Sequence, residues 1–304
     1  MKRRTFLRSS LLAPLSAAAG ASLALGGCDL LPETPLPEAQ QPRFVAWPEP
    51  ARLALVLSSG GPRGFSHVGV LKALSEIGVK PDLVVGASVG ALLGCMVCAG
   101  APMAEIEKLG LDFDFKSLVR LSLTGGYKLS GGQLAAFVNT EMSRRLGHTA
   151  LERLPLRFAA AAVDTQSGEL AAFNAGNIGR AVQASAAIPG QFDPVAIRGR
   201  MYADGDLVAP LPVRLARALG AKKVIAVDCS AYIDNPPPGS ESYRARDLHK
   251  RALNEADAKF ADLTLHPDIG YWVRLSREFR EMAARVAYEY TMARRGEIEK
   301  LVAG

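Results

Sequence analysis

Two short apolar runs early in the chain are each followed by a glycine turn and a second apolar segment. Residues 52–57 (RLALVL) lead through Ser-Ser-Gly-Gly into 64–77, where apolar residues recur every three or four positions. Residues 82–85 lead through Gly-Ala-Ser-Val-Gly into another apolar stretch. Strand, helix, strand and helix in succession are typical of a parallel sheet, because parallel neighbours need a crossover connection. The pattern therefore predicts an α/β protein.

The uncharged stretch 83–104 is also long enough for a membrane-spanning helix. Its glycines are spaced by four residues, as in packed membrane helices. However, Pro81 and Asp82 adjoin the stretch, and its first part is β-branched. Two buried elements joined by a sharp glycine turn explain these features better.

The later part of the chain continues the alternation of strands and helices. Strands are expected at 156–163 and 168–173, joined as a hairpin, and at 223–228, with helices at 177–187, 213–219 and 277–301. Residues 233–244, rich in Pro, Gly and Ser, are expected to form a surface loop. The pattern is least clear over 104–150.

The first 27 residues have the layout of an export signal peptide, with a basic start and an apolar stretch ending in small residues. The pair Arg3-Arg4 resembles a twin-arginine signal. The sequence Leu-Gly-Gly before Cys28 resembles a bacterial lipobox, which would make Cys28 the lipidated N-terminus. A plain cleaved signal with an incidental cysteine is the alternative. The expected location is the bacterial cell envelope, where the exported protein is lipid-anchored to a membrane on the periplasmic side.

Charge and cysteine content exclude several other classes of protein. The net charge is +6, but the leader carries four basic residues and no acid, so the remainder is nearly balanced and no nucleic-acid partner is predicted. Cys95 and Cys98 have CxxC spacing inside an apolar segment, which favours buried small side chains over a redox or metal site. No cluster has metal-ligand spacing, so neither a metal nor an organic cofactor is expected.

Both glycine turns are candidates for chemistry. Ser88, in Gly-Ala-Ser-Val-Gly, would project its hydroxyl from a tight strand-to-helix turn, where flanking glycines avoid clashes. The other turn, 59–64 (SGGPRG), contains consecutive glycines that can present backbone N–H groups to an anion, as an oxyanion hole does. Such a loop could also hold a nucleotide phosphate, although GxGxxG and Gly-Lys-Ser/Thr patterns are absent.

A third motif, Asp204-Gly205-Asp206, would alone be an ordinary turn. Together, in order and spacing, the three motifs resemble the patatin-like phospholipase family. The stretch 184–190 (ASAAIPG) leading to Asp193-Pro194-Val195 is also similar to that family. The resemblance covers residues 53–228 and extends more loosely to Asp268.

The resemblance implies a three-layer α/β/α sandwich with a mostly parallel central sheet. It further implies a serine acyl-ester hydrolase of the phospholipase A or lysophospholipase kind, acting on lipid. Ser88 would be the nucleophile, Asp204 its base, and Gly60, Gly61 and Arg63 the oxyanion-hole loop. The domains would be an export signal (1–27), a Pro-rich spacer after lipidated Cys28 (28–50) and a patatin-like hydrolase domain (51–304).

Two residues depart from the family pattern. Ser59 stands where the family often has a further glycine, and Asp206 where Gly or Ala usually follows the Asp-Gly pair. A free aspartate has a pKa of about 3.9, too low for an efficient general base at neutral pH. Burial beside Ser88, or repulsion from Asp206, would raise the pKa of Asp204. An elevated carboxylate pKa in the pH–rate profile is the resulting hypothesis.

Three alternatives remain open at this stage. A histidine triad in α/β-hydrolase order could combine Ser88 and Asp228 with His249 or His266, although only one strand–helix unit precedes the serine turn. The same acyl-enzyme could transfer its acyl group to an alcohol or thiol instead of water. Finally, Asp206 could have spoiled the site, leaving a lipid-binding scaffold.

Overall fold

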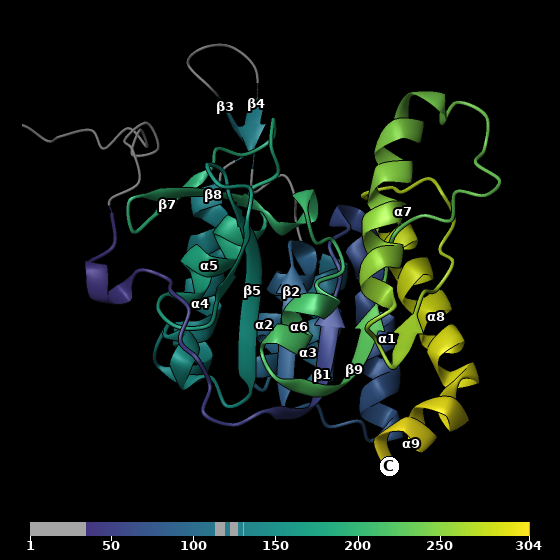
Figure 1. The fold of residues 1–304 in the computed structure, drawn as a ribbon. Coiled ribbons are helices and arrows are strands. Elements are labelled where there is room, and N and C mark those ends of the chain that lie inside the picture. The colour runs from purple at the N-terminus through teal and green to yellow at the C-terminus, as the bar shows by residue number, and fades with distance from the viewer. Residues whose placement is uncertain (1–34, 113–118, 122–126, 130, 304) are drawn as a thin grey trace, which may run out of the picture. The chain divides into compact units, whose positions relative to one another are not determined.

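The computed structural model describes residues 35–112, 119–121, 127–129 and 131–303 (Figure 1). The predicted signal peptide, Cys28 and the first part of the 28–50 spacer lie outside these residues. The described part of the spacer contains a 3₁₀ turn, Glu38–Gln40, and Arg43 then pairs with Ala175 in an antiparallel bridge. This part of the spacer is therefore hydrogen-bonded to the domain that follows it.

The central sheet has the order β10-β9-β1-β2-β5-β8-β7, and β6 pairs with β5 outside that path. Five strands are mutually parallel: β1 (Ala51–Leu57), β2 (Leu83–Ala87), β5 (Arg157–Asp164), β9 (Ala221–Val227) and β10 (Leu263–Leu265). The antiparallel strands are β6 (Leu170–Phe173), β7 (Val195–Ile197) and β8 (Arg200–Asp204). A separate antiparallel pair consists of β3 (Val119–Leu121) and β4 (Tyr127–Leu129). The predicted α/β fold with a mostly parallel sheet is confirmed.

Alternate residues of β1 face opposite sides of this sheet, and each side carries its own core. Leu53, Leu55 and Leu57 belong to one core, whereas Ala54 and Val56 belong to the other. The first core is covered by α1 (Phe65–Ile77), α2 (Val89–Cys98), α3 (Met103–Asp112), α4 (Gly131–Leu146), α5 (Ile178–Ser185), α8 (Arg277–Ala293) and α9 (Arg295–Ala303). The second is covered by α6 (Val213–Ala218) with the end of α7 (Arg244–Ala258). Helices on both faces give the three layers.

Most of the helices and strands predicted from the sequence are present, with two corrections. As predicted, the stretch 83–104 is divided into separate elements, which are β2, α2 and the start of α3, and no helix among the described residues is long and apolar enough to cross a membrane. The expected single helix 277–301 breaks at Arg294, between α8 and α9. Helix α7 was not predicted, and α3 and α4 occupy much of the unclear region 104–150.

The fold brings both glycine turns to one edge of the sheet. Strands β1 and β2 are parallel neighbours, with Leu57 aligned with Gly86, so the segments that follow them leave at the same level. After β1 comes a 3₁₀ turn, Gly61–Gly64, and after β2 comes Ser88 at the start of α2. The carboxyl edge of a parallel sheet is where such folds bind ligands.

Candidate active site

Ser88 lies in a strained turn that only its neighbouring glycines permit. Its φ of 55° is in the left-handed region, which is costly for a residue with a side chain. A Cβ on Gly90 would lie 2.2 Å from the Leu57 carbonyl oxygen, and one on Gly86 would lie 2.4 Å from that of Gly90. The glycines therefore allow β1, β2 and α2 to approach closely enough for the sharp turn.

The Ser88 hydroxyl donates a 2.7 Å hydrogen bond to Oδ2 of Asp204. Asp204 is the last residue of β8, which pairs with β5 next to β2. Both side chains are buried, with exposed fractions of 4% and 1%. The sheet order thus brings the two predicted residues, 116 positions apart in the chain, into direct contact.

The Asp204 carboxyl has the acidity of a general base suited to neutral pH. Burial raises its pKa to about 7, and the negative charge of Asp206 acts in the same direction. The backbone N–H of Asp206, which donates to Asp204 Oδ1 at 2.8 Å, and the Ser88 hydroxyl oppose that rise. A carboxylate with this pKa is far better matched to proton abstraction at neutral pH than a free aspartate.

A third residue, Ser185, holds the Ser88 turn in place. The backbone N–H of Ser88 donates to Ser185 Oγ at 3.0 Å, and that hydroxyl donates to the Ala161 carbonyl at 2.6 Å. Ser185 is fully buried at the end of α5. It lies in the 184–190 stretch noted in the sequence, but only the three-dimensional contact identifies its part in the site.

The glycine loop supplies free backbone donors beside the serine. The N–H groups of Gly60 and Gly61 have no hydrogen-bond acceptor among the residues that the structure describes, and Gly61 lines the same cavity as Ser88. Gly61 has a φ of 51°, and a Cβ on Gly60 would lie 2.5 Å from the sulfur of Cys229. Both glycines are thus required by the conformation of the loop.

Arg63 has a different position from the two glycines. Its backbone N–H donates to the Gly60 carbonyl at 3.0 Å, inside the turn. Its guanidinium donates to the carbonyl of Gly270 at 2.9 Å and to that of Tyr271. Arg63 therefore stabilises the loop and ties it to the segment before α8, and its N–H is not available to an oxyanion.

Behind the loop, two buried residues, His67 and Cys229, hold its first part. His67 Nε2 lies 2.9 Å from the Ser58 carbonyl oxygen, and the Cys229 backbone N–H donates to Ser58 Oγ at 3.0 Å. The Cys229 thiol donates to the Ser59 carbonyl at 3.3 Å. His67 comes from α1 and Cys229 from the segment that follows β9, so two separate parts of the chain fix the loop.

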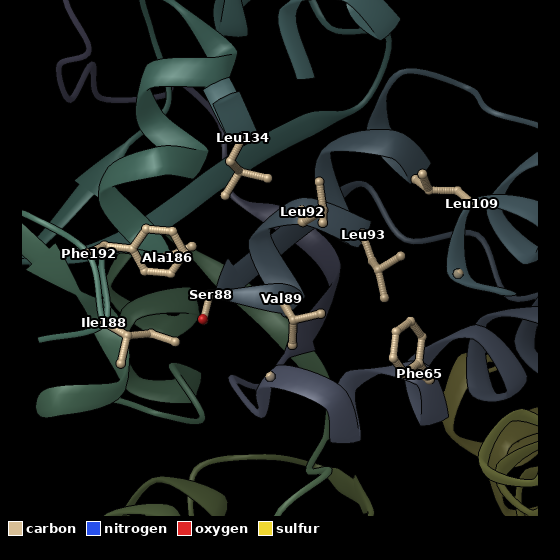
Figure 2. A pocket seen from close by; sticks show the side chains of 12 residues that line it. Phe65, Ser88, Val89, Leu92, Leu93, Leu109, Leu134, Ala186, Ile188 and Phe192 are labelled. Atoms are coloured by element: carbon tan, nitrogen blue, oxygen red, sulfur yellow. The ribbon is translucent and has the colours of Figure 1, made fainter. Parts of the chain in front are cut away.

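An apolar cavity of about 90 Å³ opens beside the serine. Figure 2 shows the Ser88 hydroxyl at its edge, between Val89 and Ile188. Apart from Ser88, the lining is apolar: Gly61, Phe65, Val89, Leu92, Leu93, Leu109, Gly110, Leu134, Ala186, Ile188 and Phe192. A cavity of this chemistry suits a hydrocarbon chain with its carbonyl carbon near the hydroxyl.

The structure does not assemble the alternative histidine triad. Asp228 accepts hydrogen bonds from Asn254, His266 Nε2 lies 3.0 Å from the Ser230 carbonyl oxygen, and His249 is exposed. The thiols of the CxxC pair, Cys95 and Cys98, are buried in α2, and burial raises the pKa of Cys95 to about 12. Among the described residues there is no group of three metal-ligating side chains.

The chain is similar to known proteins of one family. The model of the family described as patatin-like phospholipase matches residues 55–217, more than half of the chain. The chain belongs to the patatin-like phospholipase family. An uncharacterized NTE family protein of Mycobacterium tuberculosis is 33% identical over 221 residues, covering 73% of this chain and 58% of the relative. Lysophospholipase NTE1 of Coccidioides immitis is 31% identical over 201 residues, covering 62% of this chain and 12% of the relative.

A solved structure shows the same fold. VipD from Legionella pneumophila superimposes with a TM-score of 0.55 at 15% identity, covering 88% of this chain and 72% of that one. The chain spans little more than half the length of its mycobacterial relatives and a small part of the fungal ones.

Proposed function

We propose that this protein hydrolyses lipid acyl esters with Ser88 as nucleophile and Asp204 as general base. The observation that carries the proposal is the 2.7 Å hydrogen bond between them at the edge of an apolar cavity. The names of the fungal relatives point to lysophospholipids as the first substrates to test. Phospholipids with two acyl chains are the next substrate class.

In the mechanism, Asp204 takes the Ser88 proton as Oγ forms a bond to the acyl carbonyl carbon. The carbonyl oxygen becomes an oxyanion, for which the free N–H groups of Gly60 and Gly61 are the donors. The proton passes from Asp204 to the leaving alcohol as its C–O bond breaks, leaving an acyl-Ser88 ester. Water then attacks this ester with Asp204 again as base, which releases the fatty acid and restores both side chains.

The contacts of Asp206 favour a working site over the scaffold alternative. Its carboxylate is ion-paired with Lys250 at 2.5 Å, and it does not displace Ser88 from Asp204. Acyl transfer to other acceptors has no separate supporting observation. Hydrolysis in the presence of added alcohols, with product analysis, would detect it.

The test compares wild type with Ser88→Ala and Asp204→Asn on a short chromogenic ester and a lysophospholipid. Each variant is expected to lose activity by about 10³-fold or more, because neither group can be replaced when the pair acts as a unit. Labelling by a fluorophosphonate probe should disappear in Ser88→Ala. Ser240→Ala is the matched control, since Ser240 is buried but makes no contact with the dyad. Asp228→Asn removes the acid of the alternative histidine triad. Wild-type activity in Ser88→Ala would exclude the proposal, and a comparable loss in Asp228→Asn would favour a different base.

For localisation, we propose export and anchoring through lipidated Cys28, on the periplasmic side of a bacterial membrane. The proposal is supported by the basic leader and the Leu-Gly-Gly-Cys sequence. Replacing Cys28 by Ala should move the exported protein from the membrane fraction to the soluble one. Incorporation of labelled palmitate into wild type but not into the variant would identify the anchor. Equal membrane association of both would point to a signal peptide without lipidation.

A further inference from the structure

Lys250 lies in helix α7, which was not predicted. It contacts the glycine loop at Ser59 and the loop after Asp204 at Asp206. Its Nζ lies 2.5 Å from Asp206 Oδ1 and 3.0 Å from Ser59 Oγ. The Ser59 hydroxyl also donates to the same Asp206 oxygen. Ser59 directly precedes the oxyanion-loop glycine Gly60, and Asp206 is two residues after the base.

The two residues that depart from the family pattern are thus partners of each other. Ser59 and Asp206 are 147 positions apart in the chain, yet they are joined directly and through one ammonium group. A glycine at either position would remove one side of this network. We refer to Ser59, Asp206 and Lys250 below as the lysine bridge.

We propose that Lys250 is a positioning residue for hydrolysis. Through the lysine bridge, it fixes the glycine loop 59–64 relative to the loop 204–206 that carries the base. This inference rests on the proposed function of Ser88 and Asp204. The backbone N–H of Asp206 donates to Asp204 Oδ1, and the side chain of Asp206 is held by Lys250. Movement of Asp206 would therefore move a donor on the base itself.

The charges of the bridge also act on the base. Burial lowers the pKa of Lys250, but Asp206 together with Cys229 and Asp228 raises it, and the net shift is upward. Burial raises the pKa of Asp206, yet Lys250, Ser59 and Arg246 together bring it below its ordinary value. The pair is therefore ionic at neutral pH. Further charged or titratable groups nearby are Arg246, which acts on Asp206, and Asp228 and Cys229, which act on Lys250.

Asp206 and Lys250 shift the pKa of Asp204 in opposite directions. The carboxylate of Asp206 raises the pKa of Asp204, whereas the ammonium of Lys250 lowers it. Lys250→Met should therefore move the acidic limb of the kcat/KM profile to higher pH by roughly one unit, and Asp206→Asn should move it to lower pH. A residue with a merely structural role would not give shifts of opposite sign.

Positioning is tested by the kinetic parameters at the plateau of each profile. Lys250→Met should lower kcat by about 10-fold with little change in KM, because misplaced loops stabilise the transition state less well. Lys250→Arg keeps the charge and should restore the pH profile, and Lys250→Gln replaces the methionine variant if that one does not fold. In a double-mutant cycle, Ser59→Ala and Lys250→Met should be non-additive. Lys72→Met is the matched control, since Lys72 pairs with Glu107 at 3.0 Å, apart from either loop.

A readout without turnover separates this inference from the proposed function. Asp204 can be titrated by carboxyl ¹³C NMR of aspartate-labelled protein, with its signal assigned by its loss in Asp204→Asn. Opposite shifts in Lys250→Met and Asp206→Asn support the lysine bridge even if no ester is hydrolysed. Shifts of the same sign, or none, overturn it even if Ser88-dependent hydrolysis is found. Absence of Ser88-dependent hydrolysis alone counts against the proposed function only.

Discussion

Ser185 is hydrogen-bonded to the backbone of Ser88, while Asp204 is hydrogen-bonded to the Ser88 side chain. The Ser185 hydroxyl accepts the Ser88 N–H at 3.0 Å and donates to the Ala161 carbonyl of β5 at 2.6 Å. Because Ser88 has a positive φ, its turn needs support from outside the local chain. The end of α5 provides that support from the interior.

Ser185→Ala should therefore lower both stability and activity. A buried N–H and a buried carbonyl lose their partner, at a cost of about 1–3 kcal/mol each. Rotation of the Ser88 turn should reduce kcat by about 10-fold or more. Urea unfolding and ester hydrolysis are the measurements. Thr291→Ala, which removes a buried hydroxyl bonded within α8, is the control and should leave kcat unchanged.

The pH dependence of hydrolysis should follow the Asp204 carboxyl. Asp204 is a base only when deprotonated, and its pKa is about 7. Activity on a soluble ester should rise with pH, reach half its maximum near pH 7 and fall by about 10-fold per unit well below it. Rates measured from pH 4.5 to 9 would show this. A profile already flat above pH 5 would mean that the base has the acidity of an exposed aspartate.

The same raised pKa predicts a change in stability with pH. Between pH 4 and 7 the folded protein keeps the Asp204 proton while the unfolded chain loses it, so unfolding becomes more favourable as pH rises. The contribution is present at low pH and is lost through pH 7, on the order of 4 kcal/mol in all. Asp204→Asn should not show this loss. Its unfolding free energy relative to wild type should therefore increase over that range, and a constant difference would contradict the prediction.

The apolar cavity should set the length of the acyl chain. Ala186 lines it near Ser88, so Ala186→Leu would fill part of a space of about 90 Å³. We expect kcat/KM for a long-chain ester to fall by about 10-fold while an acetate ester is little affected. The ratio of the two substrates within one variant is the control. An equal loss on both would mean that the substitution has disturbed the Ser88 turn instead.

The sequence predicted what local patterns determine. Strands β1 and β2 and their glycine turns are visible because apolar runs and glycines specify them within a few residues. Ser88 was predictable for the same reason, and Asp204 only through the family resemblance, since Asp-Gly is otherwise an ordinary turn.

The remaining site residues depend on contacts across the fold. The residues that helix α7 buries are polar, Asn254 and Asp257, and Lys250 is separated from Asp206 by 44 positions in the chain. Ser59 and Asp206 therefore looked like independent departures with a cost to activity. Residues 244–258 include many strong helix formers, so their helix propensities would have indicated the helix. They would not have indicated the ion pair between Lys250 and Asp206.

Strand β9 lies between β1 and β10, although it begins at Ala221, after the stretch 55–217 that the family model matches. A fragment trimmed to the matched stretch would begin inside β1, at Leu55, and would leave the rest of that strand without its neighbour on one side. The unpaired N–H and carbonyl groups of this apolar strand would form an exposed sheet edge, at which strands of other chains can pair. Shortened versions of the protein should therefore aggregate unless they extend at least through β10.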